Sequence, residues 1–223
     1  MNQTKNGLWN SPLLRSQVTS EDVRPPEMLF GYLIGPFGAL LASGIFTSQL
    51  QNYLTNVLKL DLGFLTTLQL LSTILIVAAN LVVGQLIERT RTLAGKARPW
   101  ILLSALMLSV ASVLMFIVPF ADRTARMVWI AIAYNAYYAV GFPIYNTANS
   151  TLVPVSTRNS KQRATLASLT NIASLGVMGV GSMIFPTLVS MALKEDQRLC
   201  FVAMLGVAVF TSLTILLQFR FTL

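Results

Sequence analysis

The sequence predicts an all-α membrane protein with six transmembrane helices. Three observations support this fold class: the composition, six long apolar stretches, and the placement of the basic residues between them. Of the 223 residues, 54% are hydrophobic and 11% are charged, and the mean hydropathy is +0.65. A soluble domain carries about 25% charged residues. This chain has too few charges to cover a water-facing surface, so lipid must cover much of it.

The apolar stretches set the domain organisation. They run approximately over residues 28–54, 62–87, 100–120, 127–149, 164–193 and 199–219, named here spans one to six. About 20 residues of helix cross the hydrocarbon core, and a lipid-exposed backbone must satisfy its own hydrogen bonds, so each stretch is predicted to be a helix. Residues 1–27 are polar and proline-containing, without the pattern of a cleaved signal peptide. We expect a cytoplasmic tail with a short surface helix, followed by a transmembrane domain over 28–223.

The net charge of +8 reflects basic residues in short loops, which favours anionic lipid over nucleic acid as partner. One side holds 3 + 4 + 3 + 1 = 11 of the 16: Lys5, Arg15, Arg24, Arg89, Arg91, Lys96, Arg98, Arg158, Lys161, Arg163 and Arg220. The other side holds 5, namely Lys59, Arg123, Arg126, Lys194 and Arg198. The positive-inside rule therefore puts both termini in the cytoplasm. We expect a prokaryotic cytoplasmic membrane.

Composition also excludes several kinds of chemistry. The chain has no histidine and one cysteine, Cys200, expected to be a small buried hydrophobe. Structural zinc sites, Ser-His-Asp and Cys-His catalysis are thereby excluded, and no phosphate-binding Gly-Lys-Ser loop is present. We expect no enzyme activity, no catalytic residue, no metal and no cofactor. None of the 8 acidic residues falls in the middle of a span, where transporters usually place ion sites.

The loop between spans two and three, Gly84 to Trp100, has the most distinctive pattern. We expect Gly84 to allow a close helix approach, Glu88 to pair with the arginines, and Gly95 to form a tight turn. Pro99 suits the first turn of the next helix and Trp100 suits the membrane interface. The candidate gating residues of this loop are Gly84, Glu88, Arg89, Thr90, Arg91, Gly95, Lys96, Arg98 and Pro99.

The order and spacing of these residues resemble the major facilitator superfamily signature in the melibiose-permease-like family, the glycoside–pentoside–hexuronide:cation symporters. That pattern is approximately G-x-x-x-D-R-T-x-T-x-x-G-K-x-R-P-W, with Glu88 at the usual aspartate. Gly35-Pro36-Phe37-Gly38, and Leu152-Val153-Pro154 followed by Arg163, match the family more weakly. The resemblance implies two six-helix halves with solute between them. This chain resembles the amino-terminal half, itself two inverted three-helix repeats.

A second six-helix half is therefore the implied partner. The chain is then a natural fragment, a split gene product, a shortened form, or a subunit that pairs with another chain or with a copy of itself. This chain departs from the family at two kinds of position. The family's coupling aspartates are replaced by Leu40, Ile76, Asn80 and Asn146, and its sugar-stacking tryptophan is replaced by Ser150. Proton coupling through this half is excluded, and Asn80 and Asn146 offer only neutral oxygens. Uniport, antiport, and Na⁺ or H⁺ coupling through a second half stay open.

Span four carries a candidate substrate-binding stripe: Asn135, Tyr138, Phe142, Asn146 and Asn149, at steps of 3, 4, 4 and 3, with Tyr145 beside them. This spacing predicts one helix face. Amides and rings suit the hydroxyls and C–H faces of a neutral sugar or glycoside, and hydrogen bonding between helices is the alternative. Further candidates are Gln69, Thr73, Asn80 and Asn171.

The remaining span residues are expected to serve packing. The glycines Gly31, Gly35, Gly38 and Gly44 of span one, and Gly176, Gly179 and Gly181 of span five, should allow close packing, and Pro36 should break or kink span one. Spans three and six are almost purely apolar and suit lipid-facing support. The leading hypothesis is a transporter that works by alternating access. The alternative is a non-transporting sensor, scaffold or degenerate half-transporter; a membrane-embedded enzyme has little support.

Overall fold

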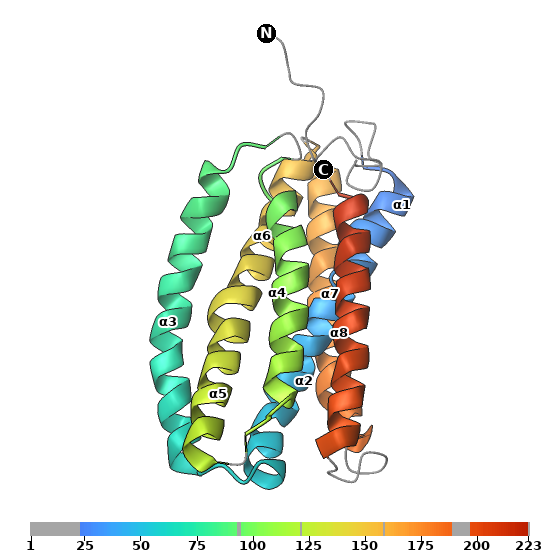
Figure 1. The fold of residues 1–223 in the computed structure, drawn as a ribbon. Coiled ribbons are helices and arrows are strands. Elements are labelled where there is room, and N and C mark those ends of the chain that lie inside the picture. Colours follow the sequence, from blue (N-terminus) through green and yellow to red (C-terminus); the bar gives the residue numbers. More distant parts are fainter. Residues whose placement is uncertain (1–22, 93–94, 121, 158, 189–196, 223) are drawn as a thin grey trace, which may run out of the picture.

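The computed structural model describes residues 23–92, 95–120, 122–157, 159–188 and 197–222, which form a bundle of long helices (Figure 1). Within these residues, six helices are long and apolar enough to cross a membrane, one for each predicted stretch. The predicted all-α fold with six membrane-spanning helices is confirmed. Residues 1–22 of the expected tail, and most of the loop between spans five and six, lie outside the described residues.

The spans differ in how regular they are. Four consist of one α-helix each: α3 (Leu62–Arg89), α4 (Arg98–Phe116), α7 (Ser160–Leu188) and α8 (Gln197–Arg220). Span one joins α1 (Pro25–Glu27), the π-helix η2 (Met28–Ile34), α2 (Phe37–Asn52) and the π-helix η3 (Tyr53–Val57). Span four joins α5 (Arg123–Asn135), the π-helix η4 (Ala136–Gly141) and α6 (Phe142–Ser156). A turn at Gly35 and Pro36 separates η2 from α2, as expected because proline lacks the N–H that would continue the helix.

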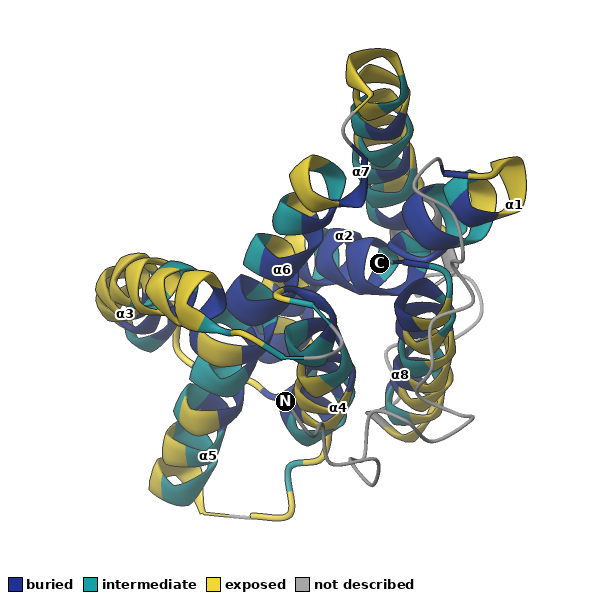
Figure 2. Cartoon of the chain, turned by 90° about the horizontal axis from the view of Figure 1, so that it is seen from above, coloured by how far each residue is buried: buried dark blue, intermediate teal, exposed yellow. Residues whose placement is uncertain are grey.

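α3 packs on span four, span four on α4, α4 on α8, α8 on α2 and α2 on α7, and α6 also contacts α7 (Figure 2). Only 17% of the apolar window of α3, and of α7, is buried within the bundle, compared with 67% for span one. Span one is therefore the centre of the fold. α3 and α7 present most of their surface to whatever surrounds this chain.

Close helix contacts in the bundle depend on the glycines of span one. A Cβ added at Gly44 would lie 2.6 Å from the Met178 carbonyl oxygen of α7, and one at Gly31 would lie 2.7 Å from the Phe221 carbonyl oxygen. The packing role predicted for these glycines is confirmed. The same prediction is wrong for Gly176 and Gly179, where an added Cβ meets nothing within 4 Å, because those positions of α7 face away from span one.

An aromatic cluster joins spans one, three and four in the half of the bundle away from Arg98. The Phe46 and Tyr137 rings meet edge to face at 4.3 Å, and the Tyr53 and Phe116 rings are 4.5 Å apart. Phe46 also stacks on Phe116 at 6.0 Å. Such pairs contribute about 0.5–1.5 kcal/mol each beyond the area they bury. The cluster fixes span four against the centre of the fold.

Candidate transport site

The residues of the predicted stripe on span four lie in different environments, some in the core of the bundle and some on its surface. Tyr145 and Asn149 are buried, with 1% and 7% of their surface exposed, whereas Asn146 is exposed. The Tyr145 hydroxyl donates to Oε1 of Gln218 on α8 at 3.2 Å, and Gln218 Nε2 donates to Asn149 Oδ1 at 2.6 Å. For Tyr145 and Asn149, the hydrogen bonds between helices that formed the alternative interpretation are present.

The π-helix η4 explains why the residues of the stripe do not share one environment. Its backbone bonds run from i to i+5, so residues on its two sides no longer follow a spacing of 3.6 per turn. Asn135, Tyr138 and Phe142 are half-buried. Asn135 Nδ2 donates to the Ala131 carbonyl at 2.9 Å, and the Tyr138 ring lies 4.6 Å from that of Tyr134. Asn146 is thus the amide of the stripe that reaches the surface of α6.

Three asparagines in the middle of spans are exposed: Asn80 on α3, Asn146 on α6 and Asn171 on α7. These helices adjoin on one side of the bundle, since α6 contacts both α3 and α7 (Figure 2). Asn80 Nδ2 donates to the Ile76 carbonyl of its own helix at 2.8 Å. The candidates Gln69 and Thr73 are exposed on the same helix α3.

Exposure of these amides has an energetic consequence. Transfer of an amide without a partner into hydrocarbon costs several kcal/mol, and polar side chains within spans usually face a bundle interior or a water-filled cavity. Apolar neighbours on α3, such as Leu81 with 68% of its surface exposed, suit lipid instead. The amide atoms that make no hydrogen bond within their own helix are therefore better placed beside water, a polar solute or another polypeptide than beside lipid.

Sequence reasoning missed the polar contacts of span six. Thr211, Thr214 and Gln218 are buried, so the expectation that this span only faces lipid is wrong for one side of α8. Thr211 Oγ1 donates to the Gly38 carbonyl at 3.0 Å, and the Gly38 N–H donates to Thr214 Oγ1 at 3.2 Å. A signal was present, because Gln218 is the only amide among residues 199–219. A lone amide in an apolar span commonly bonds to another helix.

The loop between spans two and three contains the predicted turn. Gly95 has φ of 91°, and its N–H donates to the Thr92 carbonyl at 3.0 Å, while Thr92 Oγ1 donates to the Gly95 carbonyl at 2.7 Å. Pro99 lies in the first turn of α4. Trp100 Nε1 donates to Thr90 Oγ1 at 2.9 Å across the loop. The local predictions for Gly95 and Pro99 are confirmed.

Two other expectations for this loop are not met by contacts among the described residues of this chain. A Cβ added at Gly84 would meet nothing within 4 Å, so no helix of this chain approaches it. Glu88, Arg89, Arg91 and Lys96 are exposed, and Glu88 forms no ion pair among residues 84–92 and 95–100. Arg98 differs from its neighbours, since only 4% of its surface is exposed.

Residues 31–223 match the family described as MFS/sugar transport protein. The chain belongs to this family. Its predicted membership of the major facilitator superfamily is thereby confirmed, and with six apolar helices it is an integral membrane protein.

The curated proteins similar to this chain include symporters and a sugar transporter. It is 27% identical over 176 residues to the isoprimeverose transporter of Lactiplantibacillus pentosus, 26% over 168 to the uncharacterized symporter YjmB of Bacillus subtilis, and 26% over 164 to the inner membrane symporter YicJ of Escherichia coli. The matches cover 77%, 73% and 72% of this chain but 36%, 36% and 35% of those relatives. The chain thus matches about a third of their length.

Proposed function

We propose that this chain is the amino-terminal six-helix half of a secondary transporter that moves a neutral or weakly charged solute, a sugar or glycoside, by alternating access. The observation that carries the proposal is the exposure of Asn80, Asn146 and Asn171 on three adjoining helices of an apolar bundle. Amides that both donate and accept suit sugar hydroxyls. Gln69, Thr73, Tyr138 and Phe142 belong to the proposed lining, and Tyr145, Asn149 and Asn135 hold span four in place behind it.

The passage needs a second wall, because these residues lie on an outer side of the bundle. We propose that a second six-helix half supplies it, whether from the same gene, a separate chain or a second copy. The weak burial of α3 and α7, at 17% each, supports this. With 11 basic residues on one side and 5 on the other, we place both termini in the cytoplasm and the chain in a prokaryotic cytoplasmic membrane.

Ion coupling through this half is not part of the proposal. Ile76, Asn80 and Asn146 lack the charge that helps to pay for dehydrating a cation. Na⁺ or H⁺ coupling would then run through the second half. The same substitutions favour the second candidate function, a non-transporting membrane sensor or scaffold.

Uptake measurements distinguish the two candidates. The chain is produced together with a candidate second half in cells lacking other sugar transporters, and uptake of labelled isoprimeverose and related glycosides is measured with and without Na⁺. Asn146→Val should reduce uptake by about tenfold, since a hydrogen bond in a closed site contributes about 1.5 kcal/mol. Ile132→Val, at an exposed apolar position of the same span, is the matched control.

The transport function and the sensor or scaffold function predict different results. Loss of uptake in Asn146→Val but not in Ile132→Val, at equal abundance, supports a transport passage. Equal uptake in both variants contradicts the assignment of Asn146. Stable assembly of both halves without uptake of any glycoside favours the sensor or scaffold.

A further inference from the structure

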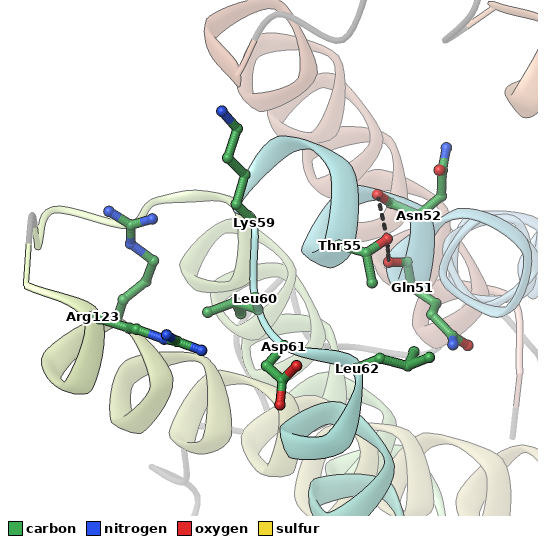
Figure 3. A pocket seen from close by; sticks show the side chains of 9 residues that line it. Gln51, Asn52, Thr55, Lys59, Leu60, Asp61, Leu62 and Arg123 are labelled. Carbon is green, nitrogen blue, oxygen red and sulfur yellow. Dashed lines mark hydrogen bonds between the residues drawn. The ribbon is translucent and has the colours of Figure 1, made fainter.

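A hollow of about 850 Å³ opens at the end of the bundle opposite Arg98 and Phe219 (Figure 3). It lies where span one ends, where α3 begins and where α5 begins. Its lining combines seven polar or charged residues, Gln51, Asn52, Thr55, Lys59, Asp61, Arg123 and Arg126, with Leu60 and Leu62. None of these residues belongs to the proposed solute passage.

The lining is positively charged. The lining contains three cations, Lys59, Arg123 and Arg126, and one carboxylate, Asp61, giving 3 − 1 = +2. They are three of the five basic residues that the charge count assigns to this side. Figure 3 shows Lys59 and Arg123 extending to the same side of the connection, away from the Asp61 carboxylate. The nearby Asp122 caps α5, where it accepts the Ala125 N–H at 3.0 Å.

Lys59 holds an unfavourable backbone conformation. Its φ is 52°, and it is the one residue other than glycine with positive φ in the described part of the chain. The left-handed region costs such a residue about 1–2 kcal/mol, and glycine would be unstrained there. A lysine at this turn therefore provides a cation where backbone geometry alone favours glycine.

The start of α3 adds to the positive potential. Asp61 is the N-cap residue, but its side chain accepts no hydrogen bond from the first turn, whose N–H groups carry partial positive charge. Arg126 Nη1 donates to the Leu58 carbonyl at 3.0 Å and ties the connection to α5. The uncapped first turn of α3 adds partial positive charge to that of the three cations. The hydrogen bond from Arg126 positions the turn that carries Lys59.

From this arrangement we propose that the hollow binds the phosphate group of an anionic lipid head group. The hollow lies at the ends of three membrane spans, at the level of head groups. Leu62, with 55% of its surface exposed, stands at its rim beside the charges and can contact the glycerol and acyl region. Arginine and lysine side chains are the usual partners of phosphate. The proposal does not depend on the proposed transport function.

Binding to phosphatidylglycerol tests the proposal directly. The purified chain in neutral detergent is titrated with phosphatidylglycerol or phosphatidylcholine, and bound lipid is counted by native mass spectrometry. Phosphatidylglycerol should bind in preference. Lys59→Gly and Arg123→Gln should each weaken its binding about fivefold, since a basic residue contributes about 1 kcal/mol to anionic lipid binding. Arg91→Gln removes an exposed cation at the opposite end and should bind as the unaltered chain does.

Lys59→Gly also separates binding from folding. Because it relieves the backbone strain, its thermal midpoint without lipid should equal or exceed that of the unaltered chain. Unchanged phosphatidylglycerol binding in Lys59→Gly and Arg123→Gln would overturn the proposal, as would an equal loss in Arg91→Gln. Displacement of the lipid by millimolar inorganic phosphate would assign the site to free phosphate and overturn the lipid assignment.

Discussion

The side chain of Arg98 closes the end of span six by binding the carbonyl oxygen of Phe219. Nε and Nη2 donate to this oxygen at 3.2 and 2.9 Å, and the guanidinium lies 4.4 Å from the centre of the Phe219 ring. Phe219 is in the last turn of α8, where carbonyls lack a helical donor and carry partial negative charge. Arg98, at the start of α4, thus caps the end of α8.

Replacing Arg98 should destabilise the bundle. Arg98→Gln removes a charged, buried donor pair, and we expect a loss of about 1.5–3 kcal/mol in the free energy of unfolding. Arg98→Lys should lose less, since it keeps the charge without the planar fork and the stacking. Unfolding in mixed micelles of sodium dodecyl sulfate measures both. Arg91→Gln, which alters an exposed arginine of the same loop, should have no effect; an equal loss there would contradict the capping role.

The Gln218 bridge predicts coupled effects in spans four and six. Gln218→Leu removes bonds to both Tyr145 and Asn149, and interhelical hydrogen bonds in membranes contribute about 0.6–1.7 kcal/mol. We expect a loss of about 1 kcal/mol in unfolding free energy. In a double-mutant cycle with Asn149→Leu, the two losses should be less than additive. Strict additivity would show that the bridge contributes nothing.

The sequence predicted which segments form helices, but it predicted much less about which side of each helix is buried. Apolar length predicted all six helices, and local chemistry predicted the turn at Gly95 and the helix start at Pro99. The rotation of span four was not predictable from spacing, because η4 interrupts the α-helical repeat. Gln218 and Arg98 were not recognised as buried, since hydropathy measures the length of a span but not which neighbour each side meets.

Substitution by alanine distinguishes glycines at close helix contacts from glycines on an open helix surface. Gly44→Ala would bring Cβ within 2.6 Å of the Met178 carbonyl oxygen, and overpacking of this kind costs about 1–3 kcal/mol. Gly176→Ala meets open space and should be neutral or stabilising by about 0.5–1 kcal/mol, because alanine favours helix. Thermal unfolding in detergent compares the two. Equal destabilisation would show that α7 does not pack on α2 as described.

The loop between spans two and three should control transport rather than folding. A Cβ added at Gly84 would meet nothing within 4 Å in this chain, and Arg89 is exposed, so neither Gly84→Leu nor Arg89→Gln should destabilise the bundle. If the second half closes against this loop, both variants should slow uptake at equal abundance. Normal uptake in both would end the hypothesis that the loop acts as a gate.

The central claim is that the exposed amides line water rather than lipid, and cysteine labelling tests it most directly. In a Cys200→Ser background, single cysteines replace Asn80, Asn146 and Asn171, or the exposed apolar residues Val82, Ile132 and Ile172. Membranes containing the protein are treated with a membrane-impermeant thiol reagent. We predict reaction at the three former asparagine positions and little at the three apolar ones. Equal reactivity of the two sets, or no reaction at any asparagine position, would contradict the account.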